Sequence, residues 1–250
     1  MRSLVKKRAK SGPSAAAKGA SAKEAIADEA PFGPAYFRRY YFSRATRVIA
    51  PVEMRVRATL IATLLRQCGV PVGSVLDAGC GIGSLRAPFA KLLPRATYTG
   101  LERSEYLCNR YGWVKGSLVD FTPGRHYDLV VCYDVLQYLD NRLAAKAIAN
   151  LARLAANALY ISALTVEDWR HNCDQTLTDS AVHLRPAEWY RRRLSRRFRH
   201  LGFGVWVRRG THASLWELER PVAALSRAPK SSRQALDAPL RPRRRPPAGR

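Results

Sequence analysis

Short apolar runs alternate with amphipathic stretches through the middle of the chain. An apolar run bounded by Gly, Pro or Asp is typical of a buried strand, whereas apolar positions three to four residues apart are typical of a helix that faces a core. On these criteria the sequence predicts five strands, near residues 75–78, 96–102, 113–118, 127–133 and 158–164. Because helical stretches separate these strands, we expect a parallel sheet with right-handed crossovers.

Helices are predicted over residues 51–67, from Ser84 to the residue before Pro94, and over 142–155. Pro51 suits the first turn of the first helix, and Ser84 is a residue type that caps helix N-termini. The 142–155 segment is rich in Ala, which has the highest helix propensity. These helices would cover both faces of the predicted sheet.

The C-terminal third carries a different pattern. A helix is expected to open at Pro186 and to place one apolar stripe, made by Tyr190, Leu194, Phe198 and Leu201, against the core. Two further strands are expected at 205–208 and 214–219. They would form a hairpin that closes the sheet.

The first predicted strand ends in a glycine-rich loop. Residues 75–85 read Val-Leu-Asp-Ala-Gly-Cys-Gly-Ile-Gly-Ser-Leu, with glycine at 79, 81 and 83. Glycine adopts positive φ and lets a ligand approach the backbone, and the helix beyond offers free N–H groups. A dinucleotide loop reads G-x-G-x-x-G, but Ser84 stands where its third glycine would be, and the carboxylate of Asp77 would repel a pyrophosphate. A ligand with an amino-acid end and a nucleoside end fits the loop better than NAD does.

The motif D-x-G-x-G-x-G after an apolar strand resembles the first motif of class I S-adenosylmethionine (SAM) dependent methyltransferases. The resemblance covers about residues 35–220. It implies a Rossmann-like methyltransferase fold of the α/β class, which is a doubly wound, mostly parallel seven-stranded sheet with an antiparallel last strand. It also implies SAM as the cofactor, held at the loop by Asp77, Ala78, Gly79, Cys80, Gly81 and Gly83.

Two further acids follow the glycine loop, at the ends of the next two predicted strands. Glu102 ends the second strand 19 residues after Gly83, and an acid at about this distance binds ribose hydroxyls in α/β nucleoside sites. By the resemblance, Asp120 would meet the adenine amino group and Phe121 or Val119 would pack on the adenine ring. Tyr133 ends the fourth strand and is expected at the cofactor as well.

Candidate catalytic residues are Asp134, beside the cleft at the end of the fourth strand, and His183. The imidazole pKa of about 6.5 suits proton removal near neutrality. His183 belongs to a connection over 165–185 that is longer than usual, and long connections are often functional. We expect this insert to form the acceptor site together with the aromatic segment over 36–42, with the substrate-binding residues Trp169, Arg185, Tyr40 and Tyr41.

Charge is concentrated at the chain ends. The 250 residues carry a net charge of +24, and residues 1–24 and 227–250 hold seven and eight basic residues with one acid each. Such composition predicts disordered basic tails over 1–30 and 223–250. Between them the expected domains are a helical, aromatic cap over 31–70 and a SAM-binding domain over 71–222.

Cysteine and histidine usage bears on compartment and metals. Five cysteines without paired spacing favour a reducing compartment and a cytoplasmic location, and scattered histidines indicate no metal site. The apolar stretch 151–164 is too short to span a bilayer, so no membrane partner is expected. The sequence carries no indication of an oligomeric state.

These observations favour methyl transfer from SAM to a small-molecule acceptor through an O, N or C nucleophile. One alternative is a nucleic-acid methyltransferase, RNA above all, that holds phosphates with the basic tails and the Arg-rich segment 191–199. A second alternative is a non-catalytic module that binds SAM.

Overall fold

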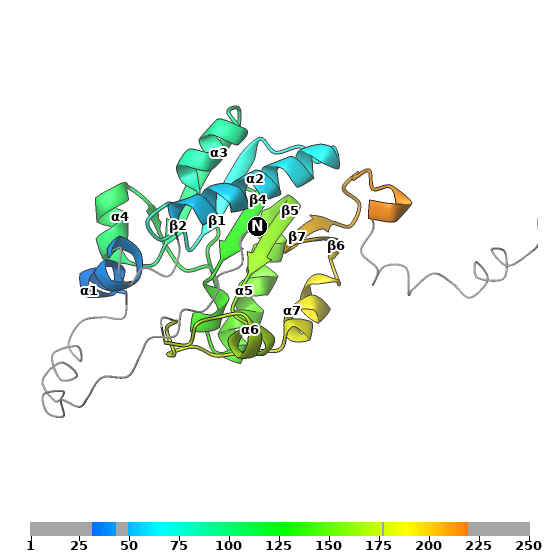
Figure 1. Ribbon diagram of the computed structural model, residues 1–250. Helices are drawn as coiled ribbons and strands as arrows, with labels where there is room; N and C mark the ends of the chain where they lie inside the picture. Colours follow the sequence, from blue (N-terminus) through cyan, green and yellow to red (C-terminus); the bar gives the residue numbers. More distant parts are fainter. Residues whose placement is uncertain (1–31, 44–49, 177, 220–250) are drawn as a thin grey trace, which may run out of the picture.

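Seven strands form one sheet through the centre of the protein, in the order β3-β2-β1-β4-β5-β7-β6 (Figure 1). The computed structural model describes residues 32–43, 50–176 and 178–219. Strands β1 to β5 run parallel, and β7 is antiparallel to both of its neighbours. The predicted doubly wound, mostly parallel sheet with an antiparallel last strand is therefore confirmed. The strands are β1 Ser74–Ala78, β2 Thr97–Glu102, β3 Val114–Lys115, β4 Tyr127–Tyr133, β5 Ala155–Ser162, β6 Phe198–Gly202 and β7 Val205–Arg208.

Helices cover both faces of this sheet. In Figure 1, α2 and α3 lie over one face, and α5 and α7 lie over the other. The short α1 and the π-helical segment η1 that follows it lie beside α4, where the rings of Phe37 and Tyr106 stack with centroids 6.3 Å apart. The helical elements are α1 Pro34–Phe37, η1 Arg38–Phe42, α2 Pro51–Gln67, α3 Arg86–Leu92, α4 Glu105–Tyr111, η2 Leu136–Tyr138, α5 Asn141–Leu154, α6 Val166–His171, α7 Ala187–Leu194 and η3 Glu217–Glu219.

The apolar residues of β4 divide between the two faces. Leu129 and Val131 belong to the core under α2 and α3, and Val130 and Cys132 belong to the core under α5. Alternate side chains of a strand point to opposite faces, so the centre of a strand with helices on both sides must be apolar at every position. Burying one such side chain contributes about 1.5–3 kcal/mol.

The order of the strands positions the site. From β1 the chain moves outward to β2 and β3, and then returns to pair β4 with the other side of β1. In such sheets ligands bind in the crevice beyond the carboxyl ends of the strands, at the point where the winding reverses. The residues after Ala78 and after Tyr133 therefore open onto that crevice.

The predicted helix from Pro186 to Leu201 is wrong in its second half. Helix α7 ends at Leu194, and Phe198 and Leu201 belong to β6. A helix would have placed both on one stripe, but in β6 Phe198 faces the α5 core and Leu201 faces the α2 core. Apolar spacing alone does not separate a helix from a helix that runs into a strand.

The predicted strand over 214–219 is also wrong. The partner of β7 is β6, joined to it by a tight turn in which Gly202, Phe203 and Gly204 all have positive φ. Two smaller differences concern boundaries. Strand β5 starts directly after α5, three residues before the predicted start at 158, and α3 begins at Arg86, so Ser84 does not cap it.

The prediction of disordered basic tails concerns residues 1–30 and 223–250, and both segments lie outside the described residues. No helix in the described part of the chain is long and apolar enough to cross a lipid bilayer.

Candidate active site

The three loop glycines have positive φ, but their surroundings differ. A Cβ at Gly79 would lie 2.5 Å from the side chain of Val135, and one at Gly83 would lie 2.4 Å from the Trp113 ring. Around Gly81, at φ +54°, nothing lies within 4 Å of the position of a Cβ. Gly79 and Gly83 are thus required by packing, and Gly81 leaves open space at the loop where a ligand can reach the backbone.

Glu102 is bound to the loop from the end of β2. Its carboxylate accepts hydrogen bonds from the backbone N–H groups of Gly81, Arg103 and Ser104 at 2.8–2.9 Å. The residue is 9 % exposed. A carboxylate held in this way presents its remaining lone pairs at a fixed place beside Gly81.

Asp77 lies at the end of β1 with 3 % of its surface exposed. Burial raises the pKa of its carboxyl to about 7, a hydrogen bond of 2.5 Å from the Tyr98 hydroxyl opposes the shift, and the charge of Glu102 adds to it. A buried carboxyl with a raised pKa binds a cationic ligand group favourably, because the cation restores the charged form.

A cavity runs along the glycine loop in two lobes, of about 70 and about 110 Å³, and we name it the loop cavity. Both lobes are lined by Tyr41, Gly79, Gly81 and Asp134. The smaller lobe contains Asp77, Cys80 and Tyr133, and the larger one contains Glu102 between apolar walls. Those walls include Phe32, Phe37, Leu101, Leu118 and Val135.

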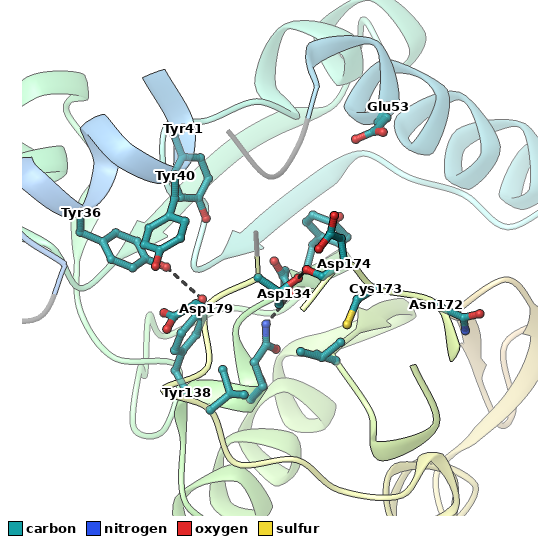
Figure 2. Close-up of a pocket in the computed structure, with 15 residues that line it drawn as sticks. Tyr36, Tyr40, Tyr41, Glu53, Asp134, Tyr138, Asn172, Cys173, Asp174 and Asp179 are labelled. Atoms are coloured by element: carbon teal, nitrogen blue, oxygen red, sulfur yellow. Dashed lines mark hydrogen bonds between the residues drawn. The ribbon is translucent and has the colours of Figure 1, made fainter. Parts of the chain in front are cut away.

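A second cavity, of about 400 Å³, opens above the end of β4 (Figure 2). We name it the tyrosine cavity, because five tyrosines line it together with four acids. The tyrosines and acids are Tyr36, Tyr40, Tyr41, Tyr133, Tyr138, Glu53, Asp134, Asp174 and Asp179. Tyr36 and Tyr138 share a hydrogen bond of 2.9 Å between their hydroxyls, and the carboxylate of Asp179 lies beside this pair in Figure 2.

Tyr41, Tyr133 and Asp134 line both cavities, so the cavities adjoin. Asp134 directly follows β4 and has φ +59°, a left-handed conformation that Asp tolerates better than most residues do. Its carboxylate accepts a hydrogen bond from the side-chain amide of Gln137. Burial raises the pKa of Asp134 above its ordinary value, and the hydrogen bond from Gln137 and the charge of Arg57 partly offset that shift.

Most of the predicted cofactor residues surround the loop cavity. Tyr40 and Tyr41, predicted for the acceptor site, line the tyrosine cavity. Ala78 is fully buried in the α5 core, and Gly83 packs under Trp113 instead of lining either cavity. The residues placed at the loop cavity are Asp77, Gly79, Cys80, Gly81, Glu102, Tyr133 and Asp134.

The structure does not bring five other predicted residues to the cavities. Asp120 is exposed, and Phe121 packs against the α5 core. Gly116, Ser117 and Leu118 line the loop cavity instead. The other three are Trp169, His183 and Arg185 of the insert, and they do not line the tyrosine cavity.

Arg185 has a structural position. It is 2 % exposed and donates hydrogen bonds to Asn141 Oδ1, to the Tyr190 hydroxyl and to three backbone carbonyl oxygens. Because these hydrogen bonds use its donors and its side chain is buried, Arg185 does not bind the methyl acceptor. His183 is exposed, which leaves Asp134 as the predicted catalytic residue at the cavities.

The site also contains residues that the sequence did not single out. Tyr36 and Tyr138 come from the aromatic N-terminal segment and from η2, and Asp174 and Asp179 come from the insert. The many aromatic residues around Tyr36 in the sequence could have identified it as a candidate for the site. The two insert acids sit among many polar loop residues, and only the path of the loop selects them.

Comparison with known proteins agrees with this geometry. Residues 76–158 match a family model described as a methyltransferase domain. That range runs from β1 through the glycine loop to the middle of β5. It therefore contains the ends of β1 and β4, which open onto the crevice. No curated protein sequence matches the chain.

Several solved methyltransferase structures are similar to this chain. DesVI of Streptomyces venezuelae is 18 % identical, with a TM-score of 0.50 over 68 % of this chain and 94 % of that one. The magnesium protoporphyrin IX methyltransferase of Synechocystis PCC 6803, crystallised with SAM, is 21 % identical with a TM-score of 0.49 over 69 % and 89 %. The plantazolicin methyltransferase BpumL is 16 % identical with a TM-score of 0.49 over 65 % and 73 %.

At these identities the structural likeness concerns the fold. The family match adds that residues 76–158, which include Asp77, the glycine loop and Glu102, are similar to a methyltransferase domain. Residues 76–158 of this chain therefore form a methyltransferase domain.

Proposed function

We propose that this protein transfers the methyl group of SAM to a small molecule bound in the tyrosine cavity. The observation that carries the proposal is the junction of the two cavities at Tyr41, Tyr133 and Asp134. A volume of about 400 Å³ lies within the range of small-molecule sites, which is about 300–1,000 Å³. A methyl acceptor in the tyrosine cavity would be separated from a cofactor in the loop cavity by a shared wall of five side chains, because Tyr36 and Tyr138 also line both cavities.

The residues of the loop cavity suit the parts of SAM. Asp77 would bind the ammonium group, the open backbone at Gly81 would take the adjoining chain, and Glu102 would accept hydrogen bonds from the ribose hydroxyls. Leu118 and Val135 offer the apolar walls that an adenine ring needs. The open space at the Cβ position of Gly81 supports this placement, because a side chain there would fill it.

SAM supplies an electrophilic methyl group on a positively charged sulfur. The protein contributes alignment, which lowers the barrier by holding the acceptor atom in line, and removal of a proton where the acceptor carries one. Asp134 stands on the wall common to both cavities, and its raised pKa suits it to accept that proton.

The nucleic-acid alternative is less well supported. Phosphates bind to Lys and Arg, but no Lys or Arg of the described residues lines the tyrosine cavity, whereas four acids do. The basic tails on which that alternative depends lie outside the described residues. The non-catalytic alternative is disfavoured by the second cavity, which a module that only holds SAM does not need.

Labelled SAM distinguishes the three functions. The full-length protein is incubated with SAM labelled in its methyl group and with a cell extract separated into small molecules, RNA and protein. We expect label in the small molecules, with matching release of S-adenosylhomocysteine. Label in RNA would favour the first alternative, and SAM binding without S-adenosylhomocysteine would favour the second.

We also propose a cytoplasmic location. All five cysteines are free, and four of them are buried inside the fold. Proteins with unpaired thiols are typical of reducing compartments. A tagged protein found outside the cytoplasm in fractionated cells would contradict this.

Glu102→Gln should weaken SAM binding by about 1–3 kcal/mol, because the amide cannot replace all the acceptors of the carboxylate and leaves buried polar groups unpaired. Calorimetry with the purified protein measures the change. Glu105→Gln is the matched control, since Glu105 lies three residues after Glu102 and is exposed, where it pairs with Lys115. Equal affinities of the two variants would remove Glu102 from the cofactor site.

SAM affinity should increase by about tenfold between pH 5.5 and pH 7, since each unit below a pKa reduces the ionised fraction about tenfold. The pKa of Asp77, at about 7, lies above its ordinary value, so the free protein holds a proton there at pH 5.5. An ammonium ligand must displace that proton, and binding therefore strengthens as pH rises. Asp77→Asn should bind more weakly and with little pH dependence, and an unchanged pH profile in that variant would contradict the assignment.

A further inference from the structure

The charge inside the tyrosine cavity is opposite to the charge of the chain. The sequence has 43 Lys and Arg against 19 Asp and Glu, yet four acids line this cavity. Among the described residues that line it, none is Lys or Arg. A cavity of this kind repels carboxylates and phosphates and attracts cations.

Two of the four acids, Asp134 and Asp179, are half-buried. The charge of Asp179 contributes to the raised pKa of Asp134 and of the hydroxyls of Tyr36 and Tyr138. Glu53 and Asp174 are exposed, and in Figure 2 Glu53 lies apart from the other acids, on the α2 side. A cation between Asp134 and Asp179 would relieve their repulsion.

A second observation concerns hydrogen bonding and is independent of charge. Gln137 is 2 % exposed and lines the cavity, and its amide nitrogen donates to Asp134. Because an ionised carboxylate only accepts hydrogen bonds, this contact fixes which way the amide faces. Its oxygen, Oε1, is buried and has no hydrogen-bond partner among the described residues. Such an acceptor is unfavourable unless a ligand donates to it, so the ligand should carry an N–H or O–H group next to Asp134.

Aromatic rings make up much of the remaining wall. The rings of Tyr36 and Tyr40 lie 4.8 Å apart, and those of Tyr36 and Tyr41 lie 6.3 Å apart. In Figure 2 these three tyrosines stand together on one side of the cavity, facing Asp134. The faces of aromatic rings attract cations, and clusters of such rings bind alkylammonium groups.

We propose that the acceptor is a small amine, which the cavity binds as its ammonium ion between Asp134, Asp179 and the tyrosine rings, with an N–H group donated to Gln137 Oε1. The inference rests on the proposed function and names the acceptor class for the same site. It selects N-methylation over O- and C-methylation.

The chemistry requires the amine to lose a proton first. The ammonium gives a proton to the carboxylate of Asp134, which exposes the nitrogen lone pair. The lone pair attacks the methyl carbon of SAM, a carbon–nitrogen bond forms, and the carbon–sulfur bond breaks with its electron pair kept on sulfur. The products are a methylated ammonium and S-adenosylhomocysteine, and Asp134 passes its proton to water.

The test separates the small molecules of a cell extract by charge. Cationic, neutral and anionic fractions from ion exchange are each incubated with the full-length protein and SAM labelled in its methyl group. We expect the label in the cationic fraction, on a compound that still binds the cation exchanger after methylation. Label confined to the neutral or anionic fractions would overturn the amine inference and leave the proposed function standing, whereas no label in any of the three would overturn both.

Asp179→Asn tests the cavity itself. Asp179 lines the tyrosine cavity but neither lobe of the loop cavity, so this variant should keep its SAM affinity. Loss of one close charge should raise the amount of cationic fraction needed for half-maximal labelling by about tenfold or more, with the maximal rate largely retained. Glu188→Gln, which removes an exposed acid on α7, is the matched control and should behave as the unmodified protein. Equal behaviour of both variants would contradict ammonium binding at Asp179.

Discussion

Asp134→Asn should lower the rate of methyl transfer by about 10²–10⁴-fold, the range that a positioned general base contributes. Asn has the size of Asp and tolerates the left-handed backbone at φ +59°, so the substitution should not disturb the turn after β4. What it removes is the ability to accept a proton. The measurement is the maximal rate with saturating acceptor, together with a thermal melt to confirm the fold.

The pH dependence of the same variant separates proton transfer from binding. In the unmodified protein the rate should rise with pH through the raised pKa of Asp134, because only the ionised carboxylate is a base. In the unmodified protein the rate should level off above that pKa, whereas in Asp134→Asn it should follow the neutral fraction of the amine and keep rising up to the pKa of the acceptor. A variant that keeps its rate, or that levels off at the same pH, would show that this carboxylate binds the acceptor without taking its proton.

Gly83→Val should destabilise the fold by about 3 kcal/mol or more, because a β-branched side chain is forced both into positive φ and into a packed ring. The backbone at Gly83 has φ +74°, and a Cβ would lie 2.4 Å from the Trp113 ring. That ring is itself anchored, since its N–H donates to the carbonyl oxygen of Gly81 at 2.9 Å. Urea or thermal unfolding measures the loss.

Gly81→Val is the matched control for Gly83→Val. Gly81 also has a positive φ, +54°, so valine is strained there as well, but a Cβ at this position would meet nothing within 4 Å. We expect Gly81→Val to cost less stability than Gly83→Val and to lose SAM binding, because the new side chain fills the space proposed for the cofactor. Equal unfolding midpoints for the two variants would mean that Trp113 does not pack over the loop.

The central sheet could be predicted from the sequence because local signals there agree. The run from β1 through the glycine loop has an apolar strand, three turn glycines and an acid, and each independently indicates the same arrangement. In β4 an uninterrupted apolar run is what a strand buried on both faces requires. The antiparallel last strand followed from the family resemblance.

Failures occurred where the decision depends on distant contacts. Phe198 and Leu201 fit a helical stripe as well as a strand, and only the pairing of β6 with β7 decides between them. Arg185 looked like a ligand for an acidic substrate because three of its five acceptors lie at residues 136–141, more than 40 positions away, and cannot be read locally. His183 had the right chemistry, but the path of the insert leaves it exposed.

The buried position of Arg185 has a consequence for how this protein could change over evolution. Thr165 and Arg185 pair at the base of the insert, and the N–H of Val166 donates to the Arg185 carbonyl oxygen at 3.1 Å. The insert residues that line the tyrosine cavity all lie beyond this pairing, between 172 and 182. With the base fastened, lengthening the segment beyond it adds only a small chain-closure entropy. We therefore expect that exchanging residues 172–182 between relatives would redirect acceptor choice while the sheet and the cofactor loop keep their stability.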